Sequence, residues 1–178
     1  TSASSPTQRP VANSTTGWDP VPPERISDSL ARLCLIDFGP EGQGTPNRTS
    51  VGAETRGGAF AWCGGPVRSK TRALAAGGPF YCDFIEGHDA TFKMAVTPPG
   101  GTFRCDLTFG DPREDRGPGV LLHGEQVLAT VPRTRAGEPR RVSVELAPVD
   151  GVLSLRVQSA DCRPWALVGL DVYGPPGA

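Results

Sequence analysis

Apolar and polar residues alternate along most of this chain, and glycine and proline interrupt the alternation at short intervals. The stretch from Gly101 to Val131 shows the pattern most clearly, as short alternating runs separated by turn residues, which is typical of a β-meander. Strands are predicted at Arg32–Phe38, Ala59–Cys63, Pro79–Ile85, Thr91–Thr97, Thr102–Phe109, Val120–His123, Gln126–Val131, Arg140–Leu146, Val152–Val157 and Ala166–Tyr173.

Turn chemistry predicts how these strands pair. His123-Gly124-Glu125-Gln126 and Val149-Asp150-Gly151-Val152 each centre a tight turn on glycine, as antiparallel hairpins require. No βαβ spacing separates the strands, and only Ile26 to Leu33, with Ser27 as a candidate N-cap, could form a helical turn. We therefore expect an all-β fold in which two antiparallel sheets pack as a jelly-roll sandwich.

The composition divides the chain in two. Residues 1–25 are rich in Ser, Thr and Pro and show no strand or helix period, so we interpret them as a linker or tail. Residues 26–178 are expected to form the β-sandwich module, a length that suits one domain. The chain begins at Thr1, which we interpret as a mature form or a fragment of a longer protein.

Charge and cysteine content limit the partners and the compartment. Lys and Arg number 18 against 19 Asp and Glu, so no overall field attracts nucleic acid, and a neutral or weakly charged partner is expected. No apolar run reaches the roughly 20 residues that span a membrane. Five cysteines without zinc spacing favour disulfides, and sequons at Asn13 and Asn47 favour a secreted glycoprotein. An odd number of cysteines leaves at least one thiol free or paired with another chain.

Sugar binding requires a flat aromatic face and planar polar side chains at a loop end of such a sandwich. Trp62 and Trp165 are the candidate aromatic platforms, with Phe80 and Tyr81 as further aromatics; the alternative is that they are core residues. Trp165 follows Arg163 and Pro164 in an expected loop, so Arg163 is a candidate ligand-binding residue beside it.

A second candidate is the loop from Asp111 to Arg116, which concentrates charges of both signs between two strands. Arg113 and Asp115 are expected to hydrogen-bond sugar hydroxyls. Asp111 and Glu114, with Asp115, are candidate ligands of a structural calcium ion that would brace the loop. The alternative is a solvated turn.

No segment of the sequence matches a catalytic motif completely. In Gly64 to Thr71, which is similar to a phosphate-binding loop, Ser69 stands where the second glycine belongs and Pro66 removes an N–H donor. No Gly-x-Ser-x-Gly occurs, and His88 and His123 both stand in turn contexts. The chain is therefore not expected to be an enzyme.

Several segments come in an order that is known from one group of proteins. They are Asp37-Phe38-Gly39, Gly58-Ala59-Phe60-Ala61-Trp62, Phe103 to Pro112, Val120 to Val127, and Leu153 to Val157. Together they resemble the galactose-binding-like, malectin-like β-sandwich modules, which are similar to the carbohydrate-binding modules attached to polysaccharide lyases and esterases. The resemblance covers roughly Leu33 to Tyr173, and the second segment departs from the Gly-Tyr-Gly-Trp that the family usually carries.

This resemblance implies further expectations. In such sandwiches the first and last strands lie side by side, which implies a disulfide between Cys34 and Cys162; Cys63 with Cys82 is a second pairing, and free thiols are the alternative. Modules of this kind often carry a calcium ion.

The functional expectation is a noncatalytic carbohydrate-binding module of a secreted multidomain protein, with carbohydrate and neighbouring domains as partners. The alternative is a structural or protein-interaction sandwich that binds no sugar. Solvent exposure of Trp62 or Trp165 distinguishes the two.

Overall fold

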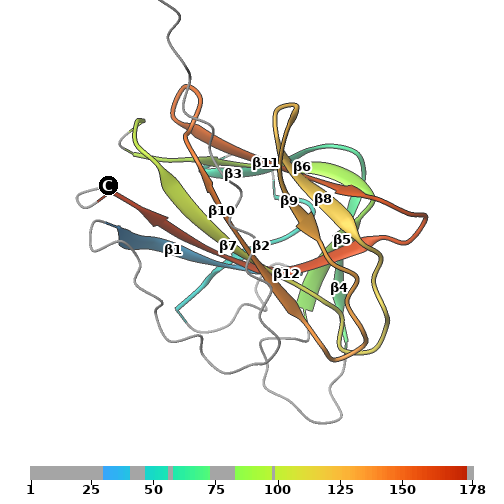
Figure 1. The fold of residues 1–178 in the computed structure, drawn as a ribbon. Helices are drawn as coiled ribbons and strands as arrows, with labels where there is room; N and C mark the ends of the chain where they lie inside the picture. The colour runs from blue at the N-terminus through green and yellow to red at the C-terminus, as the bar shows by residue number, and fades with distance from the viewer. Residues whose placement is uncertain (1–29, 41–46, 56–57, 73–82, 98, 176–178) are drawn as a thin grey trace, which may run out of the picture.

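The computed structural model describes residues 30–40, 47–55, 58–72, 83–97 and 99–175, which form an all-β sandwich of two sheets (Figure 1). The expected linker, residues 1–25, lies outside these ranges. Within the described ranges there is no helix, and so none that is long and apolar enough to cross a membrane. The predicted fold class is confirmed.

The larger sheet has seven strands and is built around β12 (Trp165–Gly174). Across the sheet the order is β10 (Arg140–Leu146), β7 (Phe103–Phe109), β12, β1 (Ala31–Phe38) and β2 (Thr49–Val51), while β5 (Asp83–Gly87) pairs with β12 and β4 (Val67–Thr71) pairs with β5. β12 therefore has β7 along one edge and both β1 and β5 along the other.

The smaller sheet has five strands in the order β3 (Phe60–Gly64), β6 (Asp89–Ala95), β11 (Val152–Ser159), β8 (Gly119–His123) and β9 (Gln126–Val131). The hairpin predicted at His123–Gln126 is present, because β8 and β9 pair and Gly124 between them has a φ of 58°. The turn predicted at Asp150 and Gly151 also forms, with φ values of 50° and 73° and a bridge between Val149 and Val152. The hairpin expected there is wrong, because β10 pairs with β7 in the larger sheet whereas β11 pairs with β6 and β8 in the smaller one. These positive φ values are what tight hairpin turns require.

The sequence prediction missed two strands. β2 is only three residues long and pairs with β1 in parallel, whereas the prediction was antiparallel throughout. β4 reads Val-Arg-Ser-Lys-Thr, which has too little apolar alternation to be recognised. The expected helical turn at Ile26–Leu33 is wrong at its end, because Ala31 to Leu33 belong to β1; its residues 26–29 lie outside the described ranges.

The core lies between the two sheets and is filled by alternate residues of each strand. At one end of the core the indole rings of Trp62 and Trp165 stack, with ring centroids 6.0 Å apart and an interplanar angle of 20°. Phe92 of β6 lies 5.2 Å from the Trp62 ring, and Phe38 of β1 lies 5.5 Å from it. This aromatic cluster joins the two sheets.

The expectation that Trp62 or Trp165 forms a sugar platform is therefore wrong. Their exposed fractions are 3% and 1%. Trp62 points inward from β3, and Trp165 is the first residue of β12, not part of the preceding loop. Their burial stabilises the folded state, because the two indole rings remove a large apolar area from water.

Replacing Trp165 by alanine is expected to lower the free energy of unfolding by about 3 to 5 kcal/mol, because it leaves a cavity beside the Trp62 ring. Urea denaturation followed by circular dichroism measures the loss. Trp165→Phe is the matched control and should lose clearly less, and a Trp165→Ala loss under about 1 kcal/mol would contradict a core role.

The predicted disulfide between Cys34 and Cys162 is wrong. The first and last strands do lie side by side, but they run antiparallel, so Cys34 pairs with Val172 near the end of β12, whereas Cys162 precedes the start of that strand. Ten residues of extended chain separate these levels by about 30 Å, which is far beyond disulfide reach. Both thiols are free. Cys63 is free and exposed, and its expected partner Cys82 lies outside the described ranges.

Cys34 lies instead against the core. Its Sγ is 3.7 Å from the Sδ of Met94 on the facing sheet. Burial, and to a lesser extent the carboxylate of Asp171, raise the pKa of this thiol to about 11. Cys34 is therefore an unreactive packing residue at neutral pH.

Candidate functional site

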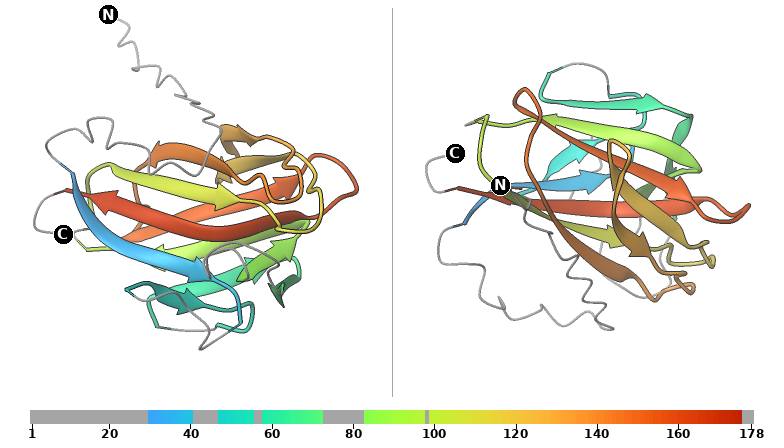
Figure 2. Two further views of the ribbon diagram at one scale, coloured as in Figure 1. Left: turned by 90° about the horizontal axis from the view of Figure 1, so that it is seen from below. Right: turned by 45° about the horizontal axis from the view of Figure 1, so that its top comes forward.

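Three loops meet at the end of the sandwich where β12 begins (Figure 2). They are the β7–β8 loop (110–118), the β9–β10 loop (132–139) and the β11–β12 loop (160–164). Arg116 and Thr134 exchange both backbone hydrogen bonds, at 2.9 and 3.2 Å, and the N–H of Ala160 donates to the carbonyl of Pro118 at 2.9 Å. These backbone bonds fix the loops to one another, and we refer to them together as the loop end.

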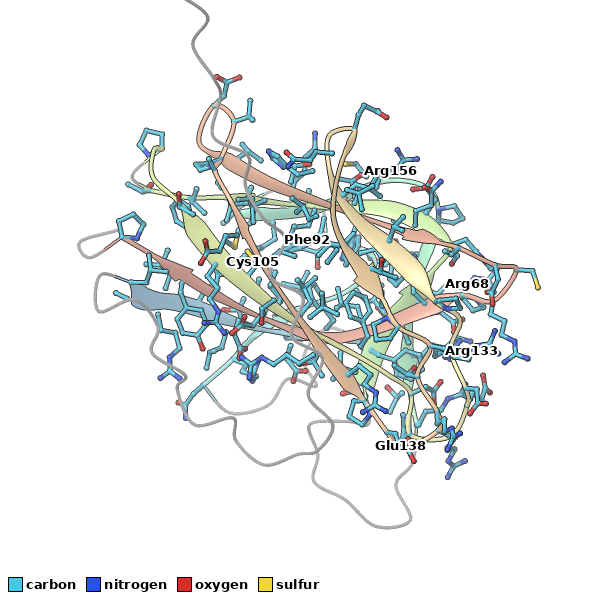
Figure 3. All side chains as sticks on the ribbon, in the orientation of Figure 1. Arg68, Phe92, Cys105, Arg133, Glu138 and Arg156 are labelled. Carbon is cyan, nitrogen blue, oxygen red and sulfur yellow. The ribbon has the colours of Figure 1, made fainter. Side chains whose placement is uncertain are left out.

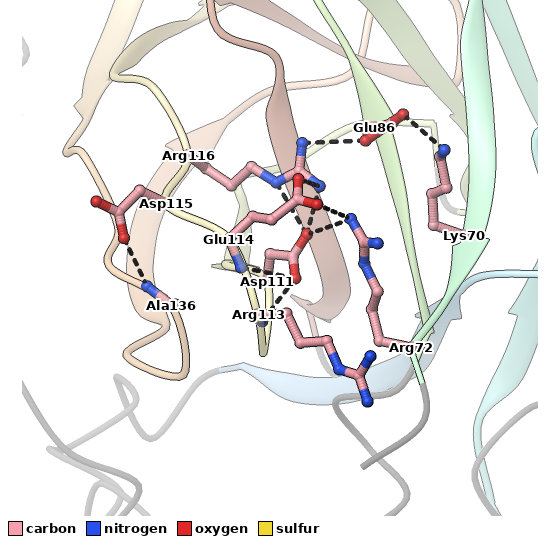
Figure 4. Close-up of polar contacts among 9 residues, drawn as sticks. All are labelled: Lys70, Arg72, Glu86, Asp111, Arg113, Glu114, Asp115, Arg116 and Ala136. Carbon is pink, nitrogen blue, oxygen red and sulfur yellow. Dashed lines mark hydrogen bonds and ion pairs between the residues drawn. The ribbon is translucent and has the colours of Figure 1, made fainter. Parts of the chain in front are cut away.

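An ion pair between Asp111 and Arg116 lies beneath the loop end (Figure 4). The Asp111 carboxylate is fully buried and the Arg116 side chain is 5% exposed. Arg116 donates to the Asp111 Oδ2 from both Nε and Nη2, and its Nη1 lies 3.0 Å from the Glu86 carboxylate. All three nitrogens of this guanidinium are therefore engaged by carboxylates.

The pair extends into a wider network. Arg72 lies 2.7 Å from Glu114 and 3.4 Å from Asp111, and Lys70 lies 3.4 Å from Glu86. Three cations thus meet three carboxylates. The network covers Phe84 of β5, whose ring lies 5.2 Å from the Arg116 guanidinium carbon and 5.9 Å from that of Arg72. We interpret the network as a brace that holds the β7–β8 loop on the outer face of the larger sheet.

The calcium prediction gains no support from this arrangement. The Asp111 Oδ1 accepts hydrogen bonds from the backbone N–H of Arg113 at 2.8 Å and from that of Glu114 at 3.2 Å. The Asp111 Oδ2 accepts from the Arg116 side chain. Asp115 accepts the N–H of Ala136 at 3.0 Å. Among the described residues no group of three or more His, Cys, Asp or Glu could hold a metal ion. The positive charge next to Asp111 in this structure comes from Arg116 and Arg72.

Replacing Asp111 by alanine is expected to lower the free energy of unfolding by about 3 to 5 kcal/mol, because it removes the main partner of a buried guanidinium. Guanidinium chloride denaturation measures the loss. Asp111→Asn keeps an acceptor for the loop N–H groups and should lose less than alanine. Equal losses for the two variants would show that the buried charge pair contributes little beyond the turn.

The outward side of the loop end carries arginines. Arg133 lies 3.1 Å from the Oδ2 of Asp161, and the Oδ1 of Asp161 accepts the backbone N–H of Arg163 at 2.8 Å. Gly117 packs against this turn so closely that a Cβ there would lie 2.3 Å from the Asp161 carboxylate and 3.0 Å from the Arg163 carbonyl. Glycine at position 117 thus allows the β7–β8 and β11–β12 loops to touch.

The structure brings some of the predicted ligand residues together. Arg113, Asp115 and Arg163 are all exposed at the loop end, as expected, but the tryptophans lie under it in the core. Arg133, which the sequence prediction missed, joins them through Asp161. Nothing in its local sequence distinguishes Arg133 from any other loop arginine, because its role depends on a contact 28 residues away.

A second charged cluster, also missed, crosses the outer face of the larger sheet. Arg141 of β10 lies 2.9 Å from Asp106 of β7 and 3.0 Å from Asp171 of β12, Arg104 lies 2.9 Å from Asp106, and Arg48 lies 2.9 Å from Asp171. We refer to this cluster as the ladder, and each of its carboxylates is shared by two arginines. The ladder holds four neighbouring segments together and leaves these carboxylates few acceptor positions for a ligand.

Two buried acids meet at the junction of β1 and β5. Asp37 is 3% exposed and Asp83 is 7% exposed. Burial raises the pKa of the Asp83 carboxyl, the nearby Asp37 raises it further, and a hydrogen bond from Thr71 opposes the shift. Because the folded-state pKa lies above the unfolded value, the folded state prefers the protonated acid, and stability is lost as pH rises through the folded pKa.

Asp83→Asn, which imitates the neutral acid, is therefore expected to increase the free energy of unfolding at pH 7, with the gain disappearing below about pH 4, where aspartic acid is protonated in both states. Urea denaturation at a series of pH values tests this. Asp89→Asn should have the opposite sign, since hydrogen bonds from Arg156 lower the pKa of Asp89. A variant of Asp83 that is less stable than the parent at neutral pH would refute the assignment.

No protein-family model matches this sequence, and no curated protein matches it. Among solved structures, protein YXIM of Bacillus subtilis is similar with a TM-score of 0.61 and 18% identity, over 79% of this chain and 39% of that one. This chain therefore spans well under half of the Bacillus protein, and the likeness shows a shared fold alone.

Two weaker likenesses concern carbohydrate-binding modules. One is CBM35 of Paenibacillus barcinonensis, with a TM-score of 0.41 and 11% identity over 67% of this chain and 94% of that one. The other is the structure of the CBM22-1 and GH10 modules of Clostridium thermocellum xylanase 10B, with a TM-score of 0.45 and 9% identity over 67% of this chain and 27% of that one. Scores this low support no inference about function. The class that the fold defines is a two-sheet β-sandwich module, which confirms the fold that the galactose-binding-like resemblance implied.

Proposed function

We propose that this chain is a noncatalytic module that binds a glycan at the loop end, within a secreted, multidomain, glycan-active protein. The observation that carries the proposal is that three loops are fixed to one another by backbone hydrogen bonds and present exposed, planar polar side chains on their outward side. Guanidinium and carboxylate groups of this kind form paired hydrogen bonds with vicinal hydroxyls.

The rigidity of this end supports the proposal further. The buried Asp111–Arg116 pair and the stacked tryptophans lie beneath the loops, so Arg113, Asp115 and Arg163 project from a fixed base. A fixed base lowers the entropy lost when the side chains engage a ligand. With no exposed aromatic ring in the described part of the chain, binding is expected to be weak per site and to gain strength from tethering to a polymer.

Affinity electrophoresis against soluble neutral and acidic polysaccharides tests the proposal. Retardation of the parent chain by at least one polymer is expected, and Arg163→Ala and Arg113→Ala should abolish it. Arg32→Ala is the matched control, because Arg32 is exposed on β1 opposite Tyr173, at the other end of β12. No retardation by any polymer would refute glycan binding.

A second function is favoured by a specific observation, the burial of both tryptophans. A structural sandwich that packs against a neighbouring domain needs no aromatic platform. The charged side chains of the ladder on the larger sheet are already paired with one another. Absence of glycan retardation, together with a higher unfolding midpoint when the chain is joined to its neighbouring domain, would support this alternative.

A further inference from the structure

We infer that the glycan carries carboxylate or sulfate groups, and that Arg68, Arg133 and Arg163 bind them. This inference rests on the proposed glycan-binding function and names its ligand class. Two of the three arginines, Arg68 and Arg133, were not among the residues expected from the sequence.

The three arginines belong to the same end of the molecule. Arg68 follows Val67 on β4, and the pairing of Val67 with Gly87, and of Gly87 with Trp165, places it at the level where β12 begins. Arg163 precedes Trp165 by two residues, and Asp161 links Arg133 to that turn. Figure 3 shows Arg68 and Arg133 at this end.

The two acidic side chains nearest these arginines in the pairing scheme, Asp161 and Glu86, are already engaged. Asp161 accepts from the Arg133 side chain and the Arg163 backbone, and Glu86 is paired with Lys70 and Arg116. In contrast, the guanidinium groups of Arg68 and Arg163 have no ion pair among the described residues, and both side chains are exposed. Around Arg68 and Arg163 the unengaged hydrogen-bonding capacity is therefore donor capacity with positive charge.

Donors of this kind select acceptors that carry charge. A guanidinium forms two parallel hydrogen bonds with a carboxylate or sulfate, and such charge-assisted bonds are about twice as strong as those to neutral oxygens. The whole chain has a formal net charge of −1, so the concentration of arginine at this end is local. A weakly charged partner, expected from the overall composition, does not complement this surface.

Isothermal titration calorimetry with the whole chain tests the inference on two matched pairs of polymers. One pair is polygalacturonate and the same polymer with its carboxylates reduced to alcohols; the other is a sulfated galactan and its desulfated form. We expect binding to at least one anionic polymer and a loss of about tenfold or more in affinity for its neutral counterpart. The polymer pair in which the anionic form binds more tightly than the neutral form identifies carboxylate or sulfate as the recognised group.

Variants locate the site. Arg163→Gln and Arg68→Gln keep much of the side-chain length but remove the charge, and each should weaken binding to the anionic polymer by about tenfold. Arg133→Gln should act similarly and still fold, because its ion pair is at the surface, with the Arg133 side chain 52% exposed. Arg32→Gln is the control for general charge loss, and unchanged unfolding midpoints exclude misfolding.

The outcomes separate the two proposals. Equal affinity for anionic and neutral polymers would overturn this inference and leave glycan binding standing, whereas binding to neither would overturn both. An equal loss in Arg32→Gln would show that the arginines at the loop end are not the site. Tighter binding of double-stranded DNA than of either anionic polymer would overturn the assignment to a glycan.

Discussion

Hydrogen bonding and packing along β12 are the constraint on which the rest of this structure depends. This single strand pairs with β7 on one edge and with both β1 and β5 on the other, and its inward side chains fill the core against the smaller sheet. Its first residue, Trp165, stacks on Trp62 across the sandwich. The strand thus fixes the spacing of the sheets and the position of the loops that precede and flank it.

The loop end follows from that constraint. Because Trp165 is anchored in the core, the β11–β12 loop must turn directly above it, where Gly117 allows the β7–β8 loop to approach. The Asp111–Arg116 pair then closes the outer face of the larger sheet over Phe84. Buried charge pairs of this kind are weak sources of net stability, but removal of one partner is costly, so the pair specifies one loop position.

Charge is used differently on different parts of the molecule. On the outer face of the larger sheet each carboxylate of the ladder is shared between two arginines, so that surface engages its own acidic groups. At the loop end Glu86 and Asp161 are likewise engaged, but Arg68 and Arg163 have no ion pair among the described residues. The recognition surface that we propose therefore lies where arginines have no carboxylate partner in the described chain, and the overall charge of the chain does not predict its position.

The sequence by itself determined the fold class, the β8–β9 hairpin, the tight turn at Asp150 and Gly151 and most strands, because strand period and positive-φ turns are local properties that short segments encode. It also placed Arg113, Asp115 and Arg163 at one loop end. Only the tertiary structure decided that both tryptophans are core, that Cys34 and Cys162 lie at opposite ends of paired strands, and that Arg133 joins the site. Those outcomes depend on strand direction and on contacts between residues far apart in the chain, which no local pattern records.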